Sequence, residues 1–216
     1  MAIPRLQQSS LERAHASASP AYLSARAESS GERTRKRATS ADAFRAARAM
    51  FDAGRSLDMV TLARELGVAR GTLYRWAGDR ERLLADVMWS MAEELYEESQ
   101  RKAKGTGADA LAHGISYFIN GLVKSQPLRD AIRDDNEAVM KILTRRRGSG
   151  VQERAVAMLQ GTIEFLEKHG LYEPRLSANI LAYAIVRIIE GFIYHDLSAG
   201  IEPNTKAANQ VIRALL

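Results

Sequence analysis

The chain has 216 residues, of which 46% are hydrophobic and 26% are charged, and its formal net charge is +5. It contains no cysteine, which excludes disulfides, thiolate metal sites and cysteine nucleophiles. No apolar run approaches the ~18 residues of a membrane span, and residues 1–5 lack the apolar stretch of a secretory signal. We therefore expect a cytoplasmic protein with no membrane contact, built as one large domain or as a small domain beside a larger one.

Positive charge is concentrated in one part of the chain. Residues 1–32 carry three basic and three acidic side chains, so they sum to zero. Residues 33–82 carry twelve Arg or Lys against six Asp or Glu, a net charge of +6, which leaves −1 for the remainder. Lys and Arg that neutralise phosphates release condensed counterions. The distribution therefore favours a polyanionic partner for residues 33–82.

The first 37 residues are predicted to form a flexible basic arm. Residues 1–32 are rich in Ser and Ala and show no sustained apolar period, which is typical of poor order, with room for a transient helix around residues 11–18. The run Arg33–Arg37 follows. It has two interpretations, an arm that follows DNA phosphates or enters the minor groove, and a solvated stretch before a helix. Arg37 is accordingly a candidate DNA contact.

Three short helices are expected between residues 38 and 84. Ser40 can cap the first, and Asp58 can cap the second. Gly67 stands where a left-handed residue would end the second helix. The third begins near residues 69–70, with Leu73 facing inward. Two short helices joined by a Gly-bearing turn are typical of a helix-turn-helix reader of the DNA major groove, although most such corners in all-α proteins bind nothing.

The run from Ala63 to Trp76, Ala-Arg-Glu-Leu-Gly-Val-Ala-Arg-Gly-Thr-Leu-Tyr-Arg-Trp, resembles the DNA-binding segment of TetR-type repressors. Asp79–Leu84 is similar to that family's entry into its fourth helix, and the close likeness covers residues 40–89. The resemblance implies arginines that bond guanine or phosphate, a threonine at a base edge and a tyrosine on a phosphate. The DNA contacts that we expect are Arg37, Arg70, Gly71, Thr72, Tyr74, Arg75 and Arg80.

Some positions depart from the pattern of the family. Trp76-Ala77 stands where many members have His-Phe, and Ala69 replaces a common Ser cap. We interpret Trp76 as a core aromatic in preference to a base-stacking one. These departures bear on the operator sequence more than on DNA binding itself.

Six further helices are expected, which makes about nine in an all-α fold divided near residue 85. They span approximately residues 79–104, 108–125, 128–144 with a bend near Asn136, 151–169, 176–198 and 204–216. No alternating strand pattern appears in the sequence, and the basic run Arg145–Arg147 is interpreted as a loop. We predict a helix-turn-helix domain at residues 38–84 and an effector-binding and dimerisation domain at residues 85–216.

The resemblance also implies a homodimer and a small-molecule effector. The penultimate and last helices of two subunits form the interface in TetR-type proteins, which here places Tyr183, Arg187, Glu190, Ile193 and Leu197 at or near the contact. The other interpretation is that Arg187 and Glu190, three residues apart, satisfy one another. Side chains of mixed aromatic and polar character suit an effector pocket; the candidates are Trp89, His113, Tyr117, Phe118, Asn120, Phe165 and Tyr194.

Residues 110–200 also resemble, more weakly, actinobacterial regulators of quorum-signal lactone degradation, which implies a lactone or acyl-chain effector. An enzyme is not indicated, because the four histidines lack metal-ligand spacing and no Gly-rich phosphate loop or nucleophile elbow appears. We expect no metal and no cofactor. The sequence predicts a dimeric repressor that a small apolar or lactone-like effector releases from a palindromic DNA operator. The alternatives are a DNA-binding regulator controlled by a protein partner and a non-specific DNA-coating protein.

Overall fold

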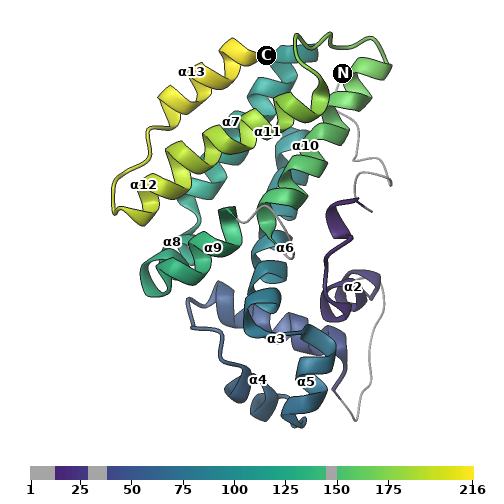
Figure 1. Ribbon diagram of the computed structural model, residues 1–216, viewed down its shortest axis with the longest axis vertical. Coiled ribbons are helices and arrows are strands. Elements are labelled where there is room, and N and C mark those ends of the chain that lie inside the picture. The colour runs from purple at the N-terminus through teal and green to yellow at the C-terminus, as the bar shows by residue number, and fades with distance from the viewer. Residues whose placement is uncertain (1–12, 29–37, 145–149) are drawn as a thin grey trace.

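The computed structural model describes residues 13–28, 38–144 and 150–216, and within these ranges it is all-helical, with twelve α-helices, one π-helical turn and no strand. Figure 1 shows an elongated molecule with α3, α4 and α5 at one end and α7, α10, α11 and α13 at the other. Helix α6 runs between the two ends. In the described ranges, no helix is both long enough and apolar enough to cross a membrane. The predicted all-α class is confirmed.

The first end of the molecule is built from α3 (Ser40–Asp52), α4 (Met59–Glu65) and α5 (Arg70–Ala77). Thr39, and not Ser40, caps α3, because its hydroxyl accepts the backbone N–H of Asp42 while the Asp42 carboxylate accepts the backbone N–H of Thr39. Asp58 caps α4 as expected. Gly67 ends the turn after α4 with φ = 65°, a conformation that a side chain would strain.

Helix α6 (Arg80–Lys102) is the structural axis of the molecule. Asp79 caps it by accepting the backbone N–H of Arg82. Residues 83–90 are all buried, because α6 packs against α3 and α5 at one end and against α7, α9 and α10 further along. A displacement of α6 therefore changes the helix packing at both ends of the molecule.

The remaining helices form the larger end, which we call the body. Helices α7 and α10 are the longest of them, α11 continues through a π-helical turn into α12, and α13 packs on α7 and α11. Their bounds are α7 Gly107–Lys124, α8 Gln126–Asp134, α9 Asn136–Thr144, α10 Val151–Lys168, α11 Ala178–Ile189, the π-helical turn Glu190–Tyr194, α12 His195–Ser198 and α13 Thr205–Leu215.

The number of helices exceeds the nine that the sequence predicts, for three local reasons. The expected helix at 128–144 is two helices, because Asp135 leaves helical geometry at φ = −147° and ψ = 59°. The expected helix at 176–198 is divided by the π-helical turn. The third addition is α2 (Pro20–Ala27), which lies in the predicted flexible arm.

Residues 13–28, which we call the N-terminal strap, pack against the rest of the molecule beside α3 (Figure 1). Ser19 caps α2 and Pro20 occupies its first turn, where a missing N–H costs nothing. Ala14, Ala21 and Tyr22 are buried almost completely. The prediction of a poorly ordered arm is wrong for residues 13–28, because small alanines permit close approach without the large apolar residues that reveal a helix in sequence. Residues 1–12 and 29–37, and with them Arg37, lie outside the described residues, as does the predicted loop at Arg145–Arg147.

Candidate nucleic-acid interface and apolar pocket

Helix α5 presents a polar surface to solvent while its other side anchors it. Leu73 and Ala77 are fully buried on the inner side. The outer side carries five of the residues that the sequence predicts as DNA contacts, with Tyr74 49% exposed and Thr72 half-buried; they are Arg70, Gly71, Thr72, Tyr74 and Arg75. The structure thus brings two guanidinium groups, one hydroxyl and one phenol onto one exposed helix surface, which we call the reader surface.

The start of α5 is held by its neighbours and not by a cap. Ala69 provides no side-chain hydrogen bond, as the missing Ser implied, but the backbone N–H of Val68 donates to the carbonyl of Ala63 at 3.0 Å and closes the turn from α4. Trp76 is half-buried and packs against the hydrophobic core, in agreement with its interpretation as a core aromatic. The reader surface therefore has a fixed angle to α4.

Arg80 has partners other than the phosphate that the resemblance implies. Its Nε donates to the carbonyl of Leu57 at 2.7 Å, and its Nη2 lies 2.7 Å from a carboxylate oxygen of Asp135. Leu57 precedes α4, whereas Asp135 lies between α8 and α9. In this arrangement Arg80 ties the reader end to the body, at about one-third exposure of its side chain.

An apolar pocket lies inside the body, between α6, α7, α10, α11 and the π-helical turn. The space between its lining atoms amounts to about 620 Å³, a figure that includes the solvent at its open side. Most of its lining is aliphatic or aromatic, and three of the predicted effector contacts, Trp89, Phe118 and Tyr194, belong to it. Such a wall suits an apolar ligand oriented by a few polar groups.

The other four predicted effector contacts are not among the residues that line this pocket. Asn120 is exposed on α7, and the Tyr117 hydroxyl donates to Glu98 at 2.6 Å on the side of α7 and α6. Phe165 stacks on His169, with ring centroids 4.0 Å apart. His113 is half-buried outside the pocket. These residues have a suitable chemical type, but their positions on the helices direct them elsewhere.

The polar residues of the pocket were not predicted as effector contacts. One of them, Glu190, was predicted instead as part of the subunit contact. Gln152 on α10 donates to Glu190 at 2.6 Å, and Arg187 donates to the other carboxylate oxygen at 2.6 Å. This geometry supports the interpretation in which Arg187 and Glu190 satisfy one another. Trp89 is fully buried, and its indole N–H has no hydrogen-bond partner among the residues that the structure describes. The residues that line the pocket therefore include a tryptophan with an unpartnered indole N–H and a carboxylate that already accepts two hydrogen bonds.

Burial controls the protonation of the two acids in the pocket wall. Burial raises the pKa of the Glu190 carboxyl, although the hydrogen bond from Gln152 and the charge of Arg187 oppose the shift. Burial, with the nearby Glu190 charge, also raises the pKa of the Tyr194 hydroxyl, so Tyr194 is a neutral hydroxyl at physiological pH.

Replacing Glu190 by glutamine should change how stability depends on pH. Because the pKa of Glu190 is raised on folding, its contribution favours the folded state below its unfolded pKa and is lost as pH rises through the folded pKa. The unfolding temperature of the natural chain, measured relative to that of Glu190→Gln, should therefore decrease as the pH is raised from 4 to 8. Thermal unfolding followed by circular dichroism tests this, and a difference that is constant with pH would contradict it.

An apolar stripe on α11 lies at the surface of the body. Ile180 and Tyr183 of α11 are 53% and 38% exposed, and the exposed Arg187 follows one turn later on the same side. Leu176, two residues before the helix, is 40% exposed. Val211 of the neighbouring α13 is 41% exposed. Two residues predicted for a subunit contact, Glu190 and Ile193, are buried inside the protomer instead, and Leu197 is half-buried. Glu190 and Ile193 belong to the π-helical turn, and Leu197 lies in α12 after it.

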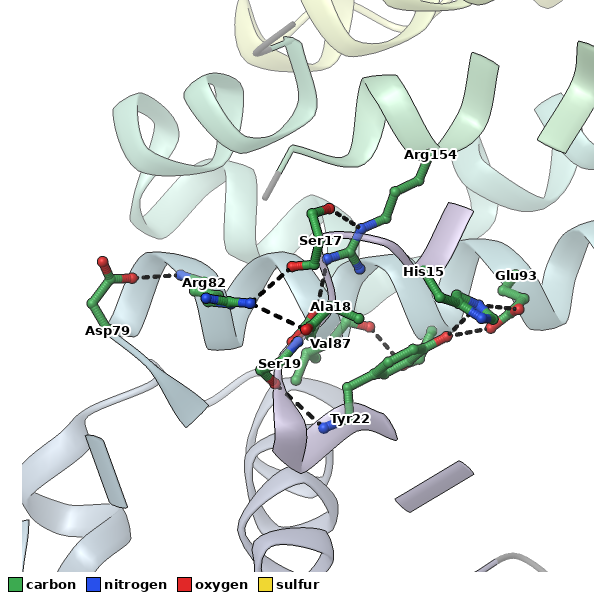
Figure 2. Close-up of polar contacts among 12 residues, drawn as sticks. His15, Ser17, Ala18, Ser19, Tyr22, Asp79, Arg82, Val87, Glu93 and Arg154 are labelled. Carbon is green, nitrogen blue, oxygen red and sulfur yellow. Dashed lines mark hydrogen bonds and ion pairs between the residues drawn. The ribbon is translucent and has the colours of Figure 1, made fainter. Parts of the chain in front are cut away.

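Behind the pocket, a buried polar network joins α6, α10 and the N-terminal strap (Figure 2). Arg154 and Asp86 form an ion pair at 2.7 Å with side chains 1% and 0% exposed. The other Asp86 oxygen accepts the backbone N–H of Ser19 at 2.8 Å, and Arg154 Nε donates to Ser17 Oγ at 3.3 Å. The guanidinium of Arg154 also lies 6.0 Å from the ring centroid of Trp89.

Comparison with known proteins gives consistent results. The model of the tetracyclin repressor-like C-terminal domain matches residues 106–216. The chain is similar to the solved structure of the transcriptional repressor QsdR of the TetR family from R. erythropolis, with 28% identity and a TM-score of 0.74, covering 81% of this chain and 92% of that one. It shares the fold of the TetR family repressor AlkX from Dietzia sp. strain DQ12-45-1b, implicated in biodegradation of n-alkanes, with 22% identity, a TM-score of 0.55 and coverage of 80% and 92%. No curated protein matches the chain.

Proposed function

The chain belongs to the TetR family, whose members are non-enzymatic DNA-binding transcriptional regulators, and we propose that it is a dimeric repressor released from a palindromic operator by a small apolar effector. The observation that carries this proposal is the continuity of α6. Its first turns pack on α5, which bears the reader surface, and its Trp89 lines the apolar pocket. One rigid element thus joins a DNA-reading helix to a ligand site.

On DNA, the roles of the reader surface follow from residue type. Arg70 and Arg75 bond guanine or phosphate through two parallel N–H groups. Thr72 approaches a base edge or a thymine methyl group, Tyr74 bonds a phosphate, and Gly71 permits close approach of the helix. Arg37 contributes a further contact from the arm. For Arg80 we propose a structural role, because its Nε and Nη2 already donate to Leu57 and Asp135.

Dimerisation supplies the second reader. The exposed stripe of Ile180, Tyr183 and Arg187, together with Val211 of α13, offers a face of the kind that TetR-type proteins pair as a four-helix interface. A twofold dimer that presents two α5 helices about 34–36 Å apart requires a palindromic operator. Effector binding then favours a conformer in which this spacing is wrong, and operator affinity falls in proportion to the difference in effector affinity between the conformers.

The effector that fits the pocket is an apolar molecule with a hydrogen-bond acceptor. A carbonyl oxygen satisfies the unpartnered indole N–H of Trp89, and an alkyl chain fills the space between the aliphatic side chains. A lactone with an acyl chain has both features, in keeping with the resemblance of residues 110–200 to regulators of lactone degradation.

The first test of this function is binding to a duplex from the region upstream of the protein's own gene, compared with a scrambled duplex at ~150 mM salt. Specific recognition predicts a preference of ~1000-fold or more. Equal, strongly salt-dependent affinity for both duplexes would support the DNA-coating alternative. Specific binding that no apolar ligand weakens would support control by a protein partner.

The reader surface is tested by Arg70→Ala, Thr72→Ala and Tyr74→Phe. Each should weaken operator binding by roughly 1–3 kcal/mol, because each removes a contact to a base or a phosphate. Each should leave the dimer intact, because these side chains lie on the outer side of α5. The matched control is Arg175→Ala, which removes an exposed arginine before α11. Fluorescence anisotropy and sedimentation provide the measurements, and unchanged affinity in all three variants would contradict the assignment.

A further inference from the structure

The N-terminal strap is bound to α6 and α10 through buried groups that the proposed DNA and effector sites do not use. Asp86 of α6 accepts the backbone N–H of Ser19, and Arg82, one turn earlier, donates to the carbonyls of Ser17 and Ala18 at 3.2 and 3.1 Å. Figure 2 shows the Arg82 side chain reaching this bend of the strap at Ser17 and Ala18. A buried carboxylate paired with a buried guanidinium is costly unless its remaining lone pairs are satisfied, and the strap satisfies one of them.

At its other end the strap is fixed to α3 and to the middle of α6. The Tyr22 ring meets Phe44 of α3 edge to face, with centroids 5.3 Å apart. The Tyr22 hydroxyl donates to Glu93 at 2.5 Å. The Glu93 side chain is 97% buried, forms a hydrogen bond of 2.9 Å with His15 and forms an ion pair with Arg26. Helix α2 contacts α5 as well. The strap therefore touches both the reader helices and the body.

Trp89 connects this network to the apolar pocket. It is one of the residues that line the pocket, and the guanidinium of Arg154 lies over its ring at 6.0 Å. Arg154 in turn holds Asp86 and Ser17. A cation–π contact of 6.0 Å thus leads from the Trp89 wall of the pocket to Arg154, and bonds of 2.7 to 3.3 Å lead from Arg154 to Asp86 and to the strap, which packs on α3 and α5.

We propose that the N-terminal strap is a second coupling element, which carries the occupancy of the pocket from Trp89 through Arg154 and Asp86 to the reader helices, in parallel with α6. An occupant that bonds the Trp89 indole shifts the ring, and with it the guanidinium that fixes Ser17 and Asp86. The packing of α2 on α3 and α5 then changes. The inference rests on the proposed function for its ligand and its DNA, but the link between strap and pocket stands on intramolecular contacts alone.

The strap is released selectively by Ala21→Glu, because a carboxylate at this fully buried position must reach water. The matched control is Ala27→Glu, which makes the same change on the exposed side of the same helix. Amide hydrogen exchange should show the α2 amides exchanging at least about tenfold faster in Ala21→Glu than in the control. A second pair, Tyr22→Ala with the exposed Leu23→Ala as its control, repeats the comparison without a new charge.

The effect on the pocket is read from tryptophan fluorescence, without DNA or ligand. The chain has two tryptophans, so Trp76→Phe leaves Trp89 as the only emitter. Because coupling is reciprocal, release of the strap should shift the Trp89 emission to longer wavelength and increase its quenching by acrylamide. The two control variants should keep the emission of the parent. Far-UV circular dichroism confirms that the body remains helical.

A second experiment measures operator affinity with and without N-octanoyl homoserine lactone, in variants that keep the natural Trp76. The proposal predicts that the lactone-induced loss of affinity falls at least about fivefold in Ala21→Glu relative to Ala27→Glu. Fast exchange in α2 with unchanged Trp89 emission and an undiminished lactone response would overturn it, as would an α2 that neither release variant opens. Failure of the unaltered protein to bind any operator would instead reject the proposed function, and the fluorescence comparison would still decide the coupling.

Discussion

Replacing Arg154 by leucine is expected to lower the free energy of unfolding by about 3–5 kcal/mol. The substitution leaves Asp86 fully buried with no cation, and the backbone N–H of Ser19 is then its main remaining donor. It also removes the guanidinium from the face of Trp89. Urea unfolding followed by circular dichroism measures the loss. If the free energy of unfolding depends on urea concentration with an unchanged slope, the folded and unfolded states keep their compactness.

Two further variants identify the cause of that loss. The double variant Arg154→Met with Asp86→Asn should recover most of the stability, because no charge remains buried and the amide oxygen of Asn still accepts the Ser19 N–H. Lys141→Leu breaks an ion pair of similar length, 2.8 Å to Glu81, but with side chains 53% and 30% exposed. It should cost less than about 1 kcal/mol. A single-variant loss no larger than that of Lys141→Leu would mean that the Arg154 pair is not a buried one.

Gly107→Ala should be the other strongly destabilising change, at about 2–4 kcal/mol. Gly107 begins α7 with φ = 53°, where a side chain costs roughly 1–2 kcal/mol. A Cβ there would also lie 2.6 Å from the carbonyl oxygen of Leu171, which is backbone and cannot turn aside. Thermal and urea unfolding should both register the loss.

The chain offers a close control for this substitution. Gly170 has nearly the same left-handed geometry, φ = 64°, but within the described part of the chain an added Cβ would meet nothing within 4 Å. Gly170→Ala should therefore cost only the conformational part, about 1–2 kcal/mol. The difference between the two variants isolates the contact between α7 and the segment before α11. Equal losses of stability would show that the backbone at Leu171 moves away from the new Cβ at no cost in free energy.

The reader end was predictable because its determinants are local. Asp58 and Asp79 cap the helices that follow them, Gly67 adopts the left-handed conformation, and Leu73 is the inward residue of α5. Caps, turns and apolar spacing depend on residues within about four positions. The predicted cap at Ser40 was one residue late, since Ser40 and Thr39 both carry a suitable hydroxyl and only the pairing with Asp42 decides between them.

The pocket and the N-terminal strap were less predictable because their contacts join distant parts of the chain. Asp86 and Arg154 are 68 residues apart, and nothing in either neighbourhood marks them as partners. Of the residues predicted as effector contacts, Trp89, Phe118 and Tyr194 line the pocket, whereas Asn120 and Phe165 are not among its lining residues. Residue type indicates what a site needs, but helix rotation decides which residues reach it.

The π-helical turn at Glu190–Tyr194 also fixes where the length of this chain can vary. The backbone N–H of His195 donates to the carbonyl of Glu190, five residues earlier, so the turn holds one residue more than an α-helix would. Removal of that residue, with return to a regular α-helix, would leave the residues after the turn in nearly the same register, because the wider turn is what absorbs the extra residue. Ser198 would then stay beside Asn136, with which it exchanges two hydrogen bonds. A relative with a regular helix here should therefore align with a one-residue gap at positions 190–194, and it can keep the Asn–Ser pair.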